Sequence, residues 1–109
     1  MAVELENKKQ YDELIASTPT VIVFAHANYT ANSRTFKSHF NSVAEEKSAD
    51  GKVAFAWYDA FDADDVNAEL VVRTFPAYFV FQDGKRTKSV LSSLANPKQL
   101  DADVAELVG

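Results

Sequence analysis

One short apolar run constrains the fold of this chain more than any other stretch. Residues 21–24 read Val-Ile-Val-Phe, a β-branched segment typical of a strand that is buried on both faces. The run ends in a loop at residues 25–29, and Thr30 then begins a long helical pattern. A strand that leads through a loop into a helix is a common place for chemistry, because the first helical N–H groups are unpaired and carry positive partial charge.

The remaining sequence alternates between strand and helix patterns. Strands are predicted at residues 3–5, 20–25, 52–58, 77–82 and 87–91. Helices are predicted at about residues 8–17, from Thr30 to about Ser48, over a short segment that contains Val66, Leu70 and Val71, and from Asn96-Pro97 to the C-terminal end. The resulting order is β-α-β-α-β-α-β-β-α, with helices expected on both faces of a mixed sheet.

Caps and turns mark the ends of these elements. Asn7 and Asn96 are predicted to cap the first and last helices, and Asp62 or Asp64 to cap the short one. Ala49-Asp50-Gly51 is predicted to end the long helix, and Asp83-Gly84 to form a hairpin turn.

The chain length, the net charge and the absence of cysteine limit the classes of protein to which this chain can belong. A chain of 109 residues is expected to be a single domain, residues 1–109, with one substantial core. Its net charge of −5 argues against binding to nucleic acid or to an anionic membrane. No apolar run approaches the length of a membrane helix, and the N-terminus lacks the apolar stretch of a signal peptide, so we expect a cytoplasmic protein. The chain has no cysteine, which excludes disulfides, thiolate catalysis and thiolate metal sites.

These elements carry several motifs that resemble the thioredoxin family. The matching segments are Tyr11-Asp12, Val21–Ala25, Phe40 with Ala44-Glu45-Glu46, Val72–Pro76, Phe81–Lys85, and Asn96-Pro97 with Leu100. The resemblance as a whole extends over residues 3–108. The resemblance implies a three-layer α/β/α domain around a central mixed sheet, the thioredoxin fold. It also implies that the bond before Pro76 is cis and that Pro76 faces the site where thioredoxins act.

The resemblance ends at that site. The family's Trp-Cys-Gly-Pro-Cys motif falls on Tyr29-Thr30-Ala31-Asn32-Ser33, so hydroxyls stand where both sulfur atoms would be. Thiol–disulfide exchange needs a thiolate and a second sulfur, so we expect no such enzyme activity and no cofactor. The family's buried aspartate and its lysine partner fall on Phe24 and Trp57, which we expect to touch and to be largely buried.

For the other candidate residues, the sequence supports a structural role better than a functional one. Thr30 is predicted to cap the helix, although its hydroxyl could instead bind the thiolate of a ligand such as glutathione. A Ser33–His26 catalytic pair is disfavoured by the expected geometry, and His26 with His39 lacks metal-ligand spacing. The acidic loop contains four aspartates, Asp59, Asp62, Asp64 and Asp65, but it lacks the glycine and the glutamate of a calcium-binding loop. The glycosylation sequon Asn28-Tyr29-Thr30 is attributed to chance.

The sequence therefore favours a redox-inactive binding or scaffolding module. The predicted partner is a protein or an extended peptide, bound in the former substrate groove without a metal ion. The groove residues are predicted to be Tyr29, Thr30, Ala31, Phe75, Pro76 and Ser92, with Leu94 nearby. Ser92 replaces the glycine that the family usually has there. A thiol- or glutathione-binding protein and a structural subunit with a buried groove remain alternatives. We expect a monomer or a weak homodimer.

Overall fold

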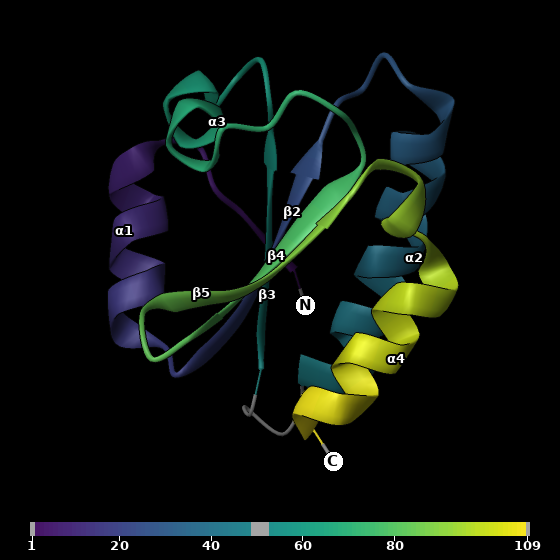
Figure 1. Cartoon of the computed structure of the whole chain (residues 1–109). Coiled ribbons are helices and arrows are strands. Elements are labelled where there is room, and N and C mark those ends of the chain that lie inside the picture. Colours follow the sequence, from purple (N-terminus) through teal and green to yellow (C-terminus); the bar gives the residue numbers. More distant parts are fainter. Residues whose placement is uncertain (1, 49–52, 109) are drawn as a thin grey trace.

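The computed structural model describes residues 2–48 and 53–108 and shows a five-stranded mixed sheet (Figure 1). The strands lie side by side in the order β1-β3-β2-β4-β5. Their bounds are Ala2–Glu4 for β1, Thr20–His26 for β2, Ala54–Asp59 for β3, Ala77–Gln82 for β4 and Lys85–Leu91 for β5. The apolar run at residues 21–24 lies in β2, the central strand of this sheet.

The neighbours of β2 explain why its residues are apolar on both sides. It runs parallel to β3, with Phe24 opposite Trp57, and antiparallel to β4, with Phe24 opposite Tyr78. All residues from Val21 to His26 are buried. A strand covered by helices on both faces and paired along both edges has no solvated side, so an alternating polar pattern is absent.

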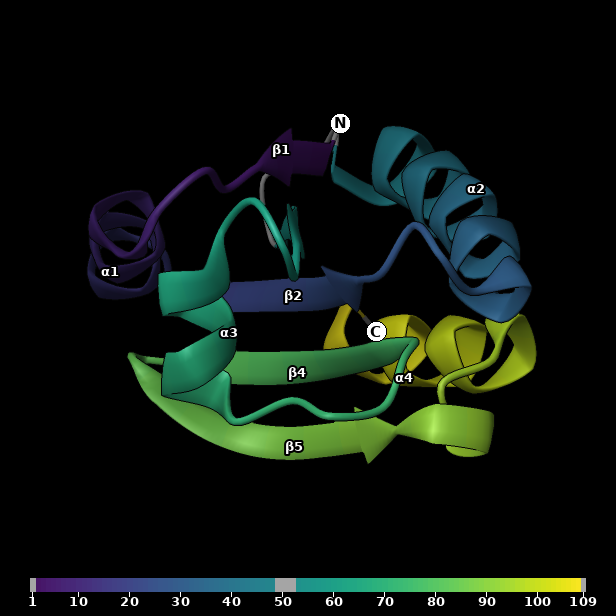
Figure 2. The same ribbon diagram turned by 90° about the horizontal axis from the view of Figure 1, so that it is seen from above.

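Two helices cover each face of the sheet, as Figure 2 shows. The helix bounds are Lys8–Ser17 for α1, Ala31–Lys47 for α2, Asp64–Leu70 for α3 and Pro97–Val108 for α4, with a short 3₁₀ turn η2 at Ser92–Leu94. Helices α1 and α3 enclose a core that includes Tyr11, Tyr58 and Phe81. Helices α2 and α4 enclose a second core, which is rich in phenylalanine. The three-layer thioredoxin fold predicted from the sequence is confirmed.

Several element boundaries differ from the prediction. Strand β2 is one residue longer and includes His26, while β5 begins at Lys85 rather than Thr87. The predicted end of the long helix at 49–51 and the predicted strand start at Lys52 lie outside the described residues.

The predicted start and end of α3 were wrong. Its N-cap is Ala63, which has no side-chain capping bond. Val71 lies beyond the helix in a left-handed conformation and is 68% exposed. In the turn that precedes α3, the Asp59 carboxylate accepts from the N–H groups of Phe61 and Asp62. The tight turn after β3 therefore uses the first aspartate of the acidic loop rather than a later one.

Candidate functional site

The first turn of α2 lies where β2 ends, and Thr30 caps it. The Thr30 hydroxyl accepts a hydrogen bond from the N–H of Ser33 at 3.1 Å and donates to the carbonyl oxygen of Ala27 at 3.5 Å. Its backbone is extended, as an N-cap requires. Because both hydrogen-bonding roles of this hydroxyl are used within the protein, nothing in the geometry directs it toward a ligand.

Ser33 and His26 form a buried pair, contrary to the prediction from sequence. The Ser33 Oγ lies 2.8 Å from Nδ1 of His26 and accepts a hydrogen bond from the N–H of Ala27 at 3.0 Å. Ser33 is fully buried and His26 is 3% exposed. The prediction failed because β2 extends to His26 and the chain then turns back, so that the first turn of α2 packs on the end of the strand.

This pair lacks the features of a catalytic dyad. A hydroxyl with no exposed surface cannot reach a substrate, and the Ser33 Oγ already has two partners. Burial and the positive charge of Lys37 lower the pKa of His26, so the ring is neutral at neutral pH. The pair therefore fastens the start of α2 to the end of β2.

The positions that correspond to the family's buried ion pair are apolar but not equally buried. Phe24 is fully buried and packs on Phe36, with ring centroids 4.8 Å apart. Trp57 is its neighbour in the register, yet it is only partly buried, and Nζ of Lys37 lies 3.9 Å from the centroid of its ring. Trp57 is less buried than Phe24 because a flexible lysine, rather than the core, covers the outer part of its ring.

Three aromatic side chains gather at the mouth of the site, and we call them the aromatic surface: Tyr29, Phe61 and Phe75. The ring centroids of Tyr29 and Phe61 are 5.5 Å apart, and those of Tyr29 and Phe75 are 6.3 Å apart. Tyr29 is 63% exposed and Phe61 is 70% exposed. Sequence reasoning missed Phe61, although a single large apolar residue within an acidic loop was a signal for it.

A groove of about 350 Å³ lies beside Phe75 and Pro76, which both line it. The peptide bond between these two residues is cis. Asn32 and Ser92 also line the groove. Of the six residues predicted from sequence, Phe75, Pro76 and Ser92 line it and Tyr29 reaches it through Phe75, whereas Thr30 and Ala31 are not among its lining residues.

Ser92 adopts a backbone conformation that glycine tolerates better. Its φ angle is 56°, in the left-handed region, and its N–H donates to the carbonyl oxygen of Pro76 at 3.0 Å. This hydrogen bond fixes the start of η2 against the groove. The conformation gives a physical reason why a glycine is usual at this place in the family.

The remaining polar candidates have structural partners. Nε2 of His39 lies 2.7 Å from a carboxylate oxygen of Asp101, which joins α2 to α4. In the acidic loop, Asp65 accepts from the backbone N–H of Lys8 at 2.8 Å. Within residues 2–48 and 53–108, no group of three or more potential metal ligands comes together. No helix among those residues is long and apolar enough to cross a membrane.

Comparison with known proteins identifies the family. A family model described as thioredoxin matches residues 2–106. The chain belongs to the thioredoxin family. It is 28% identical over 81 residues to a thioredoxin of Mycoplasmoides gallisepticum, covering 74% of this chain and 78% of that one. It is 24% identical over 102 residues to a thioredoxin of Coprinus comatus, covering 94% and 93% of the two chains.

Solved structures show the same fold. A thioredoxin of Malassezia sympodialis superimposes with a TM-score of 0.88 at 17% identity, covering all of this chain and 92% of that one. A thioredoxin of Trypanosoma brucei brucei gives a TM-score of 0.85 at 18% identity, covering 99% and 91%. This family member nevertheless has no cysteine with which to carry out thiol–disulfide exchange.

Proposed function

We propose that this thioredoxin-family protein is redox-inactive and binds an extended segment of a protein or peptide beside Pro76. The observation that carries the proposal is the backbone of Phe75. Neither its N–H nor its carbonyl oxygen forms a hydrogen bond within residues 2–48 and 53–108. An unpaired donor and acceptor on partly exposed backbone can pair with an added extended chain, and this mode of binding needs no sulfur.

The surroundings of Phe75 suit such a ligand. The exposed rings of Tyr29 and Phe61 offer apolar contact on one side of it, and the groove beside Pro76 can receive a side chain on the other. Because alternate side chains of an extended peptide point in opposite directions, one peptide can use both features at once. Affinity is expected to be modest, since few main-chain bonds and a small apolar area contribute.

The experiment begins with peptides selected from a random phage-displayed library against the full chain. Selected peptides are then titrated into isotope-labelled protein and followed by two-dimensional NMR. Saturating shifts at residues 29–33, 61, 74–77 and 92–94 support the proposal. Failure of the library to yield any saturable peptide, or shifts confined to α4, would contradict it.

Two controls separate main-chain pairing from adhesion to exposed rings. Tyr29→Ala should weaken binding of a selected peptide several-fold, whereas Val3→Ala should not, because Val3 is an equally apolar, 55% exposed residue on the edge strand β1. Peptides methylated at one backbone nitrogen at a time should lose affinity at one or two positions only. Uniform tolerance of N-methylation would rule out pairing with Phe75.

Analytical sedimentation of the free protein tests the structural-subunit alternative. A concentration-dependent dimer that Tyr29→Ala dissolves would mean that a second copy covers the aromatic surface. A monomer across the concentrations used for the titration leaves that surface available to the peptide.

A further inference from the structure

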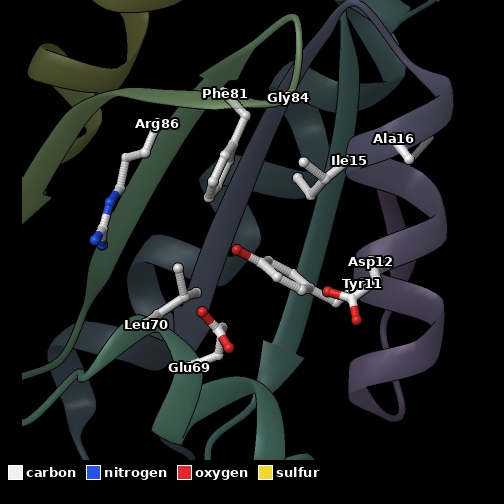
Figure 3. Close-up of a pocket in the computed structure, with 9 residues that line it drawn as sticks. All are labelled: Tyr11, Asp12, Ile15, Ala16, Glu69, Leu70, Phe81, Gly84 and Arg86. Atoms are coloured by element: carbon white, nitrogen blue, oxygen red, sulfur yellow. The ribbon is translucent and has the colours of Figure 1, made fainter.

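A second cavity lies on the opposite side of the sheet from α2, between α1, α3 and the β4–β5 hairpin (Figure 3). Its volume is about 490 Å³, which is within the range of small-molecule sites. It opens near the Phe81 end of β4, whereas the groove of the proposed function lies before the first residue of that strand, Ala77. The two sites therefore share no lining residue.

The Tyr11 hydroxyl is a polar group on the wall of this cavity. Tyr11 is 7% exposed, and its ring packs edge-on against Phe81 with centroids 5.9 Å apart. Figure 3 shows its hydroxyl pointing into the cavity. No hydrogen bond joins this hydroxyl to another group within residues 2–48 and 53–108, and its oxygen is not enclosed in the core, since no buried side-chain nitrogen or oxygen among those residues lacks a partner. The hydroxyl is therefore open to the cavity, where it can donate to water or to a ligand.

Charged groups of opposite sign flank that hydroxyl. Burial and the Glu69 carboxylate raise the pKa of Tyr11 to about 12, while the Arg86 guanidinium acts in the opposite direction, so both groups are close enough to influence it. The hydroxyl thus stays protonated at neutral pH and can donate a hydrogen bond. Within residues 2–48 and 53–108 Arg86 forms no ion pair, and its guanidinium lies over the ring of Phe79, 5.4 Å from the centroid. The only cation within 4 Å of a Glu69 carboxylate oxygen among those residues is Nζ of Lys8, at 3.8 Å.

Away from these groups the lining is mostly apolar, although Asp12 also lines the cavity, where its carboxylate pairs with Nζ of Lys8 at 2.7 Å. Ile15, Ala16 and Phe81 line the part toward the hairpin, as Figure 3 shows, whereas Arg86, Glu69 and the Tyr11 hydroxyl lie toward α3. A matching ligand needs an anion and a cation close together at one end and an apolar body at the other. A free α-amino acid with an apolar side chain has this layout.

We propose that the cavity binds a free α-amino acid with an apolar side chain. Its carboxylate would accept from Arg86 and the Tyr11 hydroxyl, its ammonium group would pair with Glu69, and its side chain would lie on Phe81 and Ile15. Arginine suits a carboxylate because its planar donors match the two oxygens. This site is independent of the peptide groove, so either can fail without the other.

The test is an NMR titration of the full chain with L-phenylalanine. We expect saturable shifts at residues 11–16, 69–70 and 81–86, with a dissociation constant roughly in the millimolar range for so small a ligand. The analogue 3-phenylpropionate lacks the ammonium group and should bind several-fold more weakly. Absence of saturable shifts, shifts elsewhere in the protein, or equal binding of the analogue would each overturn the assignment.

Variants then test the individual contacts. Tyr11→Phe keeps the ring and should weaken L-phenylalanine binding roughly tenfold, because it removes one hydrogen bond to a charged group. Its urea midpoint should stay close to wild type, which shows that the protein still folds. Arg86→Gln should abolish saturation, whereas Lys98→Gln removes the same charge from the far face of the domain and should change nothing. Unaltered binding by Tyr11→Phe or Arg86→Gln would refute the proposed contacts.

Discussion

A buried carboxylate on α4 offers the sharpest test of what holds the C-terminal helix on the sheet. Asp103 is 4% exposed and accepts hydrogen bonds from the Tyr78 hydroxyl on β4, Nζ of Lys88 on β5 and, at 3.1 Å, Nε2 of Gln99. Tyr78 is fully buried. Removing the carboxylate by Asp103→Ala would leave that hydroxyl without a partner in the core.

The expected loss of unfolding free energy is about 1–4 kcal/mol. A buried hydroxyl left unsatisfied costs about 1–3 kcal/mol. Lys88 contributes only about 0–1 kcal/mol, because its side chain is 43% exposed and can return to water. Urea denaturation, followed by the fluorescence of Trp57 and by circular dichroism, gives the value directly. A change below about 0.5 kcal/mol would refute the reasoning, since that is the size of an ordinary surface substitution.

A double-mutant cycle isolates the Tyr78–Asp103 contact. Asp103→Leu leaves the Tyr78 hydroxyl without an acceptor, and Tyr78→Phe removes one donor from the Asp103 carboxylate. The two changes together leave an apolar contact in which no hydroxyl lacks a partner. The double variant should therefore lose at least about 1 kcal/mol less than the sum of the single variants. Losses that add within about 0.5 kcal/mol would mean that the two groups are not energetically coupled.

The same carboxylate predicts a dependence on pH. Burial alone would raise the pKa of Asp103, but the hydrogen bonds from Lys88, Tyr78 and Gln99 more than offset it, and the pKa is lowered from 3.8. A group whose folded pKa is lowered stabilises the fold above its ordinary pKa and loses that contribution as the pH falls through the folded value. Wild type should therefore lose its advantage over Asp103→Asn below about pH 4, and a constant difference down to pH 2 would contradict this sign.

Three further outcomes are expected. The protein should not accelerate insulin reduction by dithiothreitol, because it has no cysteine, and turnover above the uncatalysed rate would contradict redox inactivity. Phe24→Asp should destabilise the fold by about 3–5 kcal/mol in urea denaturation, and adding Trp57→Lys should recover part of the loss by pairing the new acid, whereas purely additive losses would argue against a paired site. Ser92→Gly should raise the unfolding free energy by up to about 1 kcal/mol, because its left-handed backbone strains a side chain, and a clear loss would show that the serine side chain matters more than the strain.

The elements of this fold could be predicted because their signals are local. The bounds of α1 and β4 match the prediction, since a capping asparagine, a proline and a hairpin turn mark their ends. The predicted bounds of α3 were wrong for a different local reason. Several aspartates there could each cap a turn, and the one that does is Asp59, the last residue of β3, which accepts from the turn before α3 rather than from α3 itself.

The candidate site was predicted only in part, because its decisive contacts join segments that are distant in sequence. Tyr29 and Phe61 meet only because β2 and β3 run parallel and their C-terminal loops emerge at one edge of the sheet. The burial of Trp57 depends on Lys37, which reaches across from α2. The charged groups near the Tyr11 hydroxyl, Glu69 on α3 and Arg86 on β5, are likewise distant in sequence, and no pattern within α1 predicts them.

The His26–Ser33 pair shows how a thioredoxin-family site can keep its shape without sulfur. The position of the second family cysteine is fully buried here, and a bare apolar residue would leave the N–H of Ala27 without a partner. The Ser33 hydroxyl satisfies that N–H and the imidazole together, while Thr30 caps the same turn of the helix. Both hydroxyls are thus explained by the hydrogen-bonding needs of the strand–helix junction. Within residues 2–48 and 53–108, the polar groups of the site that stay unpaired are the N–H and the carbonyl oxygen of Phe75. These groups and the exposed rings beside them are the contacts that we propose for a partner.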